Sequence, residues 1–121
     1  MKQKTIQKAF SLEGVGLHSG AQVKMNFQPA GVDHGIKFQR LDLEGEPVVH
    51  ADIGRVVSTE RSTPIKSGEA SISTVEHVMS ALAGLEVDNI LIQLDGPEIP
   101  ILDGSAIQFV EALQTAGIEE Q

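Results

Sequence analysis

The sequence predicts an α+β fold, a two-layer sandwich in which two helices pack on one face of a mainly antiparallel sheet. Three observations lead to this prediction. Alternating apolar and polar residues recur through the first half of the chain, which is typical of strands. Two segments in the second half instead repeat apolar residues at helical spacing. Between them lies a β-branched run followed by turn residues, which predicts a strand pair between the two helices.

The first half of the chain is expected to form most of the sheet. Gly14, Gly16 and Gly20 lie close together, which predicts a tight turn or a close backbone approach. The segment 58–69 is rich in hydroxyl and turn-forming residues and is expected to be a long loop. The predicted strands cover residues 3–13, 21–27 and 36–40, with short candidates at 48–50 and 56–57.

The stretch 71–84 predicts one short helix. Ser73 and Glu76 have the spacing of a capping box, which would start the helix. Gly84 is expected to end it, because glycine adopts a left-handed conformation without strain. An apolar stripe at i, i+3, i+4 and i+7 would face the core, formed by Val75, Val78, Met79 and Leu82.

The opposite face of this helix carries an acid, an imidazole and small residues. A solvated helix face normally carries long charged side chains. We therefore expect a ligand, a second domain or a partner chain to approach this face, and His77 not to be a core histidine. The residues of the face are Glu76, His77, Ser80 and Gly84, flanked by Ala81 and Ala83.

After this helix the residues 87–94 predict a central strand, because apolar side chains occur on both of its faces. Asp95-Gly96 is a hairpin turn signal. The segment 97–102 is expected to return as a strand, and its two prolines favour an edge strand or an irregular one.

A second helix is predicted from Ser105 to the glycine at 117. Ser105 and Gln108 form another capping box, and Gly117 ends the helix. Its apolar stripe would be Ala106, Phe109, Val110, Leu113 and Ala116.

Composition excludes several classes of function. The 121 residues suit a single domain, 1–121, with a net charge of −8 and a pI near 4.8. Since no Lys/Arg cluster occurs, nucleic-acid binding and attraction to a membrane surface are disfavoured. The absence of cysteine excludes disulfides and thiolate zinc sites. No signal peptide or run of transmembrane length occurs, so we expect a cytoplasmic protein without membrane insertion.

Glu76 and His77 are the candidate catalytic pair. His77 could bind a metal ion, and Glu76 could act as general base for a water beside it. A catalytic zinc needs three protein ligands, and no histidines occur here at i, i+3 or i, i+4, so the other ligands would come from another segment. The simpler interpretation makes Glu76 a capping acid and His77 an exposed residue, and spacing alone favours it. Among the other histidines, His18 and His34 suit loops.

Two other chemistries find little support. Gly14-Val15-Gly16 lacks the third glycine of a dinucleotide fingerprint and does not precede a helix. No nucleophile-elbow pattern occurs in the sequence to support a Ser/His/Asp catalytic site.

Three motifs together resemble a known family. They are Gly14-Val15-Gly16-Leu17-His18-Ser19-Gly20, the segment from Ser73-Thr74-Val75-Glu76-His77 to Asp88-Asn89, and Pro97-Glu98-Ile99-Pro100-Ile101-Leu102-Asp103-Gly104-Ser105-Ala106. In this order they closely resemble the N-terminal domain of UDP-3-O-acyl-N-acetylglucosamine deacetylases. These are zinc amidohydrolases that catalyse the committed step of lipid A biosynthesis in Gram-negative bacteria. The match covers nearly the whole chain and is weakest from His34 to Ser71.

The resemblance implies specific roles. His77 would be a zinc ligand, and Glu76 the general base that activates the water attacking the acetamide of the UDP-sugar acyl substrate. His18 and its neighbour Leu17 would lie near the substrate. In the family the active site lies between two similar α+β domains. The second brings two more zinc ligands, a Lys and the His that protonates the leaving amine.

The second domain is absent from this sequence, so we expect the isolated chain to be inactive. A non-catalytic alternative is an interaction module that binds a partner through the small-residue face of the 74–84 helix. A third alternative is self-association through the face that a C-terminal domain would cover.

Overall fold

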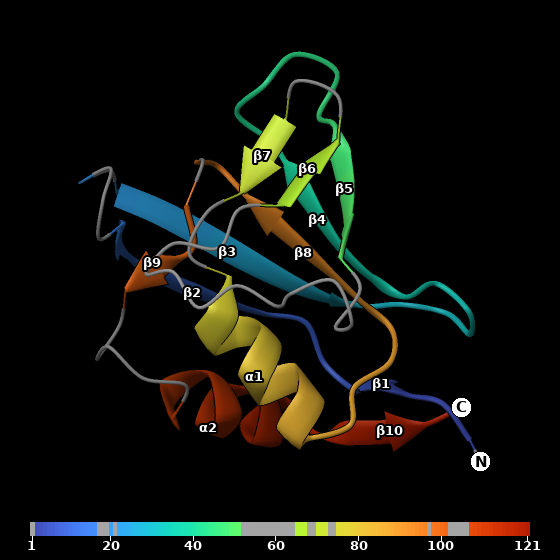
Figure 1. Cartoon of the computed structure of the whole chain (residues 1–121). Coiled ribbons are helices and arrows are strands. Elements are labelled where there is room, and N and C mark those ends of the chain that lie inside the picture. Colours follow the sequence, from blue (N-terminus) through green and yellow to red (C-terminus); the bar gives the residue numbers. More distant parts are fainter. Residues whose placement is uncertain are drawn as a thin grey trace.

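The computed structural model describes residues 2–16, 20, 22–51, 65–67, 70–72, 75–96, 98–101 and 107–121. Its main feature is a six-stranded sheet with the order β5-β4-β8-β3-β2-β9 (Figure 1). The pairing is antiparallel throughout except between β4 and β8, which run parallel. The strands of this sheet are β2 (Phe10–Gly16), β3 (Gln22–Pro29), β4 (Ile36–Arg40), β5 (Val48–Ala51), β8 (Ile90–Leu94) and β9 (Pro100–Ile101).

One face of this sheet forms the core. In β3 the alternating residues Val23, Met25 and Phe27 are completely buried, as a strand period of two requires. The ring of Phe10 stacks on that of Phe27 with centroids 4.4 Å apart, which links β2 to the same face. The neighbouring strands add Ile36, Phe38, Ile90, Ile92 and Leu94.

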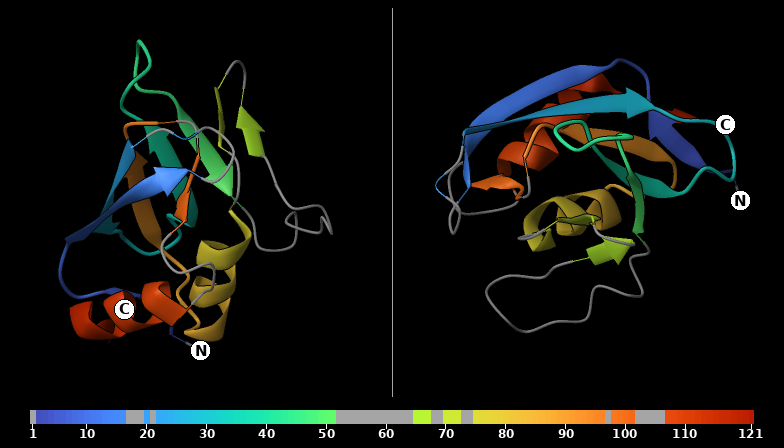
Figure 2. Two further views of the ribbon diagram at one scale, coloured as in Figure 1. Left: turned by 90° about the vertical axis from the view of Figure 1, so that its left-hand side faces the viewer. Right: turned by 90° about the horizontal axis from the view of Figure 1, so that it is seen from above.

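Two helices, α1 (Glu76–Gly84) and α2 (Ile107–Ala116), lie on the same side of the sheet (Figure 2). The predicted apolar stripe of α1 is confirmed, since Val75, Val78, Met79 and Leu82 are all buried. In α2 the buried residues are Phe109, Leu113 and Ala116. The α+β sandwich with a mainly antiparallel sheet is therefore confirmed. No helix in the described part of the chain is long and apolar enough to cross a bilayer.

Two small sheets complete the described elements. Strand β1 (Lys4–Ile6) pairs with β10 (Ile118–Glu120), so the two ends of the chain lie side by side (Figure 1). Strand β6 (Ile65–Ser67) pairs with β7 (Ala70–Ile72) in a hairpin that precedes α1.

Several predicted element boundaries are wrong. The single strand over 3–13 is two strands, β1 and β2, because β1 pairs with the distant β10 instead of continuing into the main sheet. The predicted loop 58–69 contains β6, and Ile72 belongs to β7 instead of α1. Residues 56–57 lie outside the described residues.

The strand after the Asp95-Gly96 turn does not return beside β8. Both edges of β8 are already paired, with β3 and with β4. Strand β9 pairs instead with Val15 and Gly16 at the end of β2. Its predicted place at an edge of the sheet is confirmed, and its proline at position 100 suits that place.

Candidate active site

The candidate site lies at the start of α1. The first helical hydrogen bond runs from Met79 N to Val75 O, over 2.9 Å, and Glu76 is the first helical residue. Val75 is the N-cap and makes no side-chain capping hydrogen bond. The prediction that a capping box at Ser73 starts the helix is therefore wrong, because the helix begins two residues later than that box requires. Ser73 itself lies outside the described residues.

The end of α1 also differs from the prediction. Gly84 is the last helical residue, and the left-handed residue is Glu86, with φ of 58°. Glu86 N donates to Ala83 O over 3.1 Å, and Val87 N donates to Leu82 O over 2.9 Å. This pair of bonds is a Schellman motif, which closes the helix two residues after Gly84.

The buried side of α1 determines which of its residues face away from the core. Val78, Met79, Ala81 and Leu82 are buried, so the helix cannot rotate about its axis without exposing core residues. Glu76 and His77 are half-buried, whereas Ser80, Ala83 and Gly84 are exposed. The expectation that His77 is not a core residue is confirmed, and so is the small-residue character of the exposed face, except that Ala81 belongs to the core.

The carboxylate of Glu76 has an unusual environment. Its Oε2 atom is buried and has no hydrogen-bond partner among the residues that the structure describes. A buried polar atom without a partner costs about 1–3 kcal/mol, so such atoms are rare unless a ligand or function requires them. Glu76 also occupies the first turn of α1, where the helix dipole stabilises a negative charge. Within the described part of the chain, the site thus holds a buried acceptor oxygen without a donor, and His77 is the next residue of the helix.

The structure brings two of the three sequence motifs together. Gly16 of the first motif pairs with Pro100 of the third motif through β2 and β9. Gly20 N donates to Gly16 O over 3.0 Å, and Gly20 has φ of 69°, so the predicted glycine turn is confirmed. Leu17 and His18 come between Gly16 and Gly20 in the sequence and lie outside the described residues. In Figures 1 and 2 the start of α1 lies towards the end of the sheet where β9 pairs with β2.

Glu98 is a buried acid that the sequence analysis did not select. Its residue is only 2% exposed, although it lies in the short connection between β8 and β9. A buried carboxyl group must be paired to be tolerated, and Glu98 has such an interaction. In the sequence, the burial of Glu98 is indicated by its position beside Ile99 and Pro100, which is unusual for a solvated acid.

Two other histidines, His34 and His50, lie within the described part of the chain. His34 is half-buried in a turn, with its Nδ1 atom 3.0 Å from Gly35 O. His50 is exposed on β5, opposite Lys37 of β4. Among the described residues, no group of three or more potential ligands could hold a metal ion.

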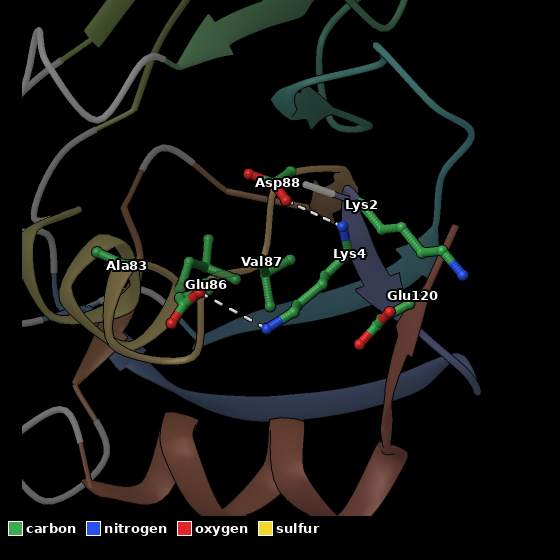
Figure 3. A pocket seen from close by; sticks show the side chains of 8 residues that line it. Lys2, Lys4, Ala83, Glu86, Val87, Asp88 and Glu120 are labelled. Carbon is green, nitrogen blue, oxygen red and sulfur yellow. Dashed lines mark hydrogen bonds and ion pairs between the residues drawn. The ribbon is translucent and has the colours of Figure 1, made fainter.

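A cavity of about 420 Å³ lies at the other end of α1 (Figure 3). Its lining residues Leu82, Ala83 and Glu86 follow Glu76 by six to ten positions, or roughly 9–15 Å along a helix. Lys4 Nζ lies 3.6 Å from the Glu86 carboxylate, and Lys4 N donates to Asp88 Oδ2 over 2.9 Å. This cavity is separate from the candidate site.

Comparison with known proteins identifies related sequences. The family described as "UDP-3-O-acyl N-acetylglycosamine deacetylase" (LpxC) matches residues 3–121. A "UDP-3-O-acyl-N-acetylglucosamine deacetylase" of Acidithiobacillus ferrooxidans is 50% identical over 121 residues, which cover 100% of this chain and 40% of the relative. That of Xanthomonas campestris pv. campestris (strain B100) is 51% identical over 120 residues, or 99% of this chain and 40% of the relative.

A longer relative extends the comparison. The "Bifunctional enzyme LpxC/FabZ" of Bacteroides thetaiotaomicron is 49% identical over 121 residues, which cover 100% of this chain and 26% of the relative. The chain thus spans between about a quarter and two fifths of the length of these relatives.

Proposed function

Because the chain belongs to the UDP-3-O-acyl N-acetylglycosamine deacetylase family of hydrolases, we propose that residues 1–121 form the N-terminal domain of such an enzyme and supply part of its active site. The substrate is UDP-3-O-acyl-N-acetylglucosamine, and the product acetate is released in lipid A biosynthesis in the cytoplasm. The observation that carries this proposal is the buried Oε2 atom of Glu76, at the start of α1, which has no hydrogen-bond partner among the described residues.

His77 is the zinc ligand of this part of the site. A neutral imidazole nitrogen is a common zinc ligand, and half-burial leaves the ring accessible. Zinc, when bound, polarises the acetamide carbonyl as a Lewis acid. The remaining ligands come from a second domain, which packs against the exposed face of α1.

Glu76 is the general base. Its Oε2 accepts a proton from the attacking water while the oxygen–carbon bond to the acetamide carbonyl forms. The C–N bond then breaks, the sugar amine takes up a proton from another group, and acetate leaves. Glu76 lies in the first turn of α1, at the positive end of the helix dipole. In this proposal Leu17 and His18 lie near the substrate.

The test is a chimaera in which this chain replaces the matching part of the Acidithiobacillus ferrooxidans enzyme. The chimaera is expected to deacetylate the substrate, whereas the isolated chain is expected to bind zinc weakly and to be inactive. Glu76→Gln should lower kcat by about 10²–10⁴-fold with the zinc content retained. His77→Ala should lower the zinc content itself.

Glu111→Gln is the matched control, because Glu111 is an exposed acid on α2, and it should leave both kcat and zinc content unchanged. Full turnover by the Glu76→Gln chimaera would overturn the assignment of the base. The alternative of a non-catalytic interaction module rests on the exposure of Ser80, Ala83 and Gly84. The interaction-module alternative would be supported if neither Glu76→Gln nor His77→Ala affects turnover, whereas substitutions on this exposed face weaken domain association.

A further inference from the structure

A groove of about 380 Å³ lies between β2 and α2, away from the candidate active site. Leu12 and Glu13 of β2 both line it. Consecutive residues of a strand point to opposite faces of a sheet, so a groove that touches both must lie along an edge of β2. The other edge of β2 is paired with β3 along Phe10–Val15, and the groove therefore follows the edge that β3 leaves open.

This edge is unpaired over most of its length in the described part of the chain. Strand β9 pairs only with Val15 and Gly16, at the far end of β2. The backbone of Phe10–Gly14 thus presents an open strand edge, which is a template for pairing with another extended chain. The opposite wall of the groove is one face of α2, formed by Gln108, Glu111, Ala112 and Thr115 at i, i+3, i+4 and i+7.

The groove combines apolar and acidic contacts. Leu12 and Ala112 are half-buried and form its apolar part. Glu13 and Glu111 are exposed and acidic, and no cationic side chain lines the groove. Two of the exposed large apolar residues lie nearby in the sequence. Val15, 44% exposed, lies two residues after Glu13 and on the same face, and Ile107, 60% exposed, lies one turn before Glu111.

We propose that this groove binds an extended basic segment of a partner protein, which adds a strand to the open edge of β2. Main-chain hydrogen bonds to Phe10–Gly14 would supply affinity, and alternate side chains would contact α2. Five residues of such a segment span about 17 Å. Lysine or arginine at every second position would lie on the face of Glu13, and the residues between them would face Leu12 and α2. A second copy of this chain is a poor occupant, because it would bring two acidic edges and two net charges of −8 together.

The test uses a labelled synthetic peptide, acetyl-Lys-Val-Lys-Val-Lys-amide, and the full 121-residue chain. We expect saturable binding by fluorescence anisotropy, with NMR shift changes concentrated in β2 and α2. The peptide acetyl-Lys-Pro-Lys-Pro-Lys-amide carries the same charge but lacks two of the backbone N–H donors. The proline peptide should bind the chain at least about tenfold more weakly than the parent peptide does. The parent peptide should bind the double variant Glu13→Gln/Glu111→Gln more weakly by a similar factor.

The double variant Glu44→Gln/Glu119→Gln is the matched control, since it removes two exposed carboxylates elsewhere and should bind like the parent. Equal binding of the proline peptide would overturn strand addition. Undiminished peptide binding to Glu13→Gln/Glu111→Gln, or NMR shift changes confined to other surfaces, would show that the peptide does not bind in this groove. Dimerisation through β2, observed by sedimentation without peptide, would assign the edge to a second copy and also overturn the proposal.

Discussion

The side-chain amide nitrogen of Asn89 donates a hydrogen bond to the side-chain oxygen of Gln121 over 2.8 Å. The same nitrogen donates to Gln3 Oε1 over 2.7 Å, and Asn89 Oδ1 accepts from Gly35 N over 2.8 Å. Asn89 is only 1% exposed. One buried amide thus ties both ends of the chain and the turn before β4 to the start of β8.

Asn89→Leu is expected to lower the free energy of unfolding by about 2–4 kcal/mol, because it removes three hydrogen bonds and leaves the half-buried Gly35 N–H without this acceptor. Asn26→Leu is the control, because Asn26 is half-buried and accepts one side-chain bond, from Ser11, over 2.9 Å. It should cost less than about 1 kcal/mol. Urea denaturation followed by circular dichroism measures both. Similar losses in the two variants would argue against a special role of Asn89.

Glu86→Gly is expected to stabilise the protein. Glu86 has φ of 58° at the end of α1, where an L-residue is strained and glycine is not. Its ion pair with Lys4, over 3.6 Å, contributes little, since the Glu86 side chain is 70% exposed. The expected gain in the free energy of unfolding is about 0.5–1 kcal/mol. Glu86→Gln removes the charge and keeps the strain, and it should change stability by less than about 0.5 kcal/mol.

The corresponding position after α2 allows the reverse experiment. Gly117 has φ of 88°, and an added Cβ would lie 2.7 Å from Gln7 Oε1. Gly117→Ala is therefore expected to cost about 1–2 kcal/mol, chiefly through the backbone strain. Thermal unfolding should show shifts of opposite sign for Glu86→Gly and Gly117→Ala. Shifts of the same sign would show that φ does not control stability at these two helix ends.

Elements with local signals could be predicted from the sequence. The apolar stripe Val75, Val78, Met79 and Leu82 and the alternation in β3 both depend on residues within a few positions of each other. The central place of β8 was also predicted, because Ile90, Leu91 and Ile92 put apolar side chains on both faces. Such periodicity reports which side of an element is buried, whatever the topology.

The features that were missed depend on distant residues. Lys4–Ile6 has only three residues and no clear alternation, and its partner Ile118–Glu120 lies more than a hundred positions away. The pairing of Pro100 with Gly16 could not follow from the Asp95-Gly96 signal, because it depends on which edges of the sheet remain free. At the candidate site, the helical period predicted that Glu76 and His77 lie off the apolar stripe, and both are half-buried. The Oε2 atom without a partner among the described residues emerged only from packing.

The pair Arg40 and Asp42 predicts a specific pH dependence. Arg40 Nε donates to Asp42 Oδ1 over 2.8 Å, and Nη2 donates to Oδ2 over 2.7 Å. These side-chain hydrogen bonds lower the pKa of Asp42 below its ordinary value of 3.8. The Asp42 carboxylate therefore binds a proton more readily in the unfolded chain than in the folded protein. The stabilisation is fully present above about pH 4 and is lost as the pH falls through the lower pKa of the folded state.

Asp42→Asn should remove this contribution. Near neutral pH it is expected to lower the free energy of unfolding by about 1–3 kcal/mol, since it removes charged hydrogen bonds to a buried guanidinium. The difference between the variant and the parent should shrink as the pH falls below about 4, because the parent loses the same interaction on protonation. Urea denaturation at a series of pH values measures it. A difference that stays constant down to acid unfolding would contradict the linkage to Asp42.

Glu76→Leu separates a functional from a structural role of the candidate base. If Glu76 were retained for its position at the helix start, replacing it would cost about 0.3–1 kcal/mol through the lost dipole interaction. Its buried, unpartnered Oε2 atom acts in the opposite direction and costs about 1–3 kcal/mol. We therefore expect Glu76→Leu to raise the free energy of unfolding by about 1 kcal/mol. Glu111→Leu, at an exposed acid of α2, should change it by less than about 0.5 kcal/mol. A clear loss of stability in Glu76→Leu would instead favour the structural interpretation, because the carboxylate would then stabilise the helix it begins.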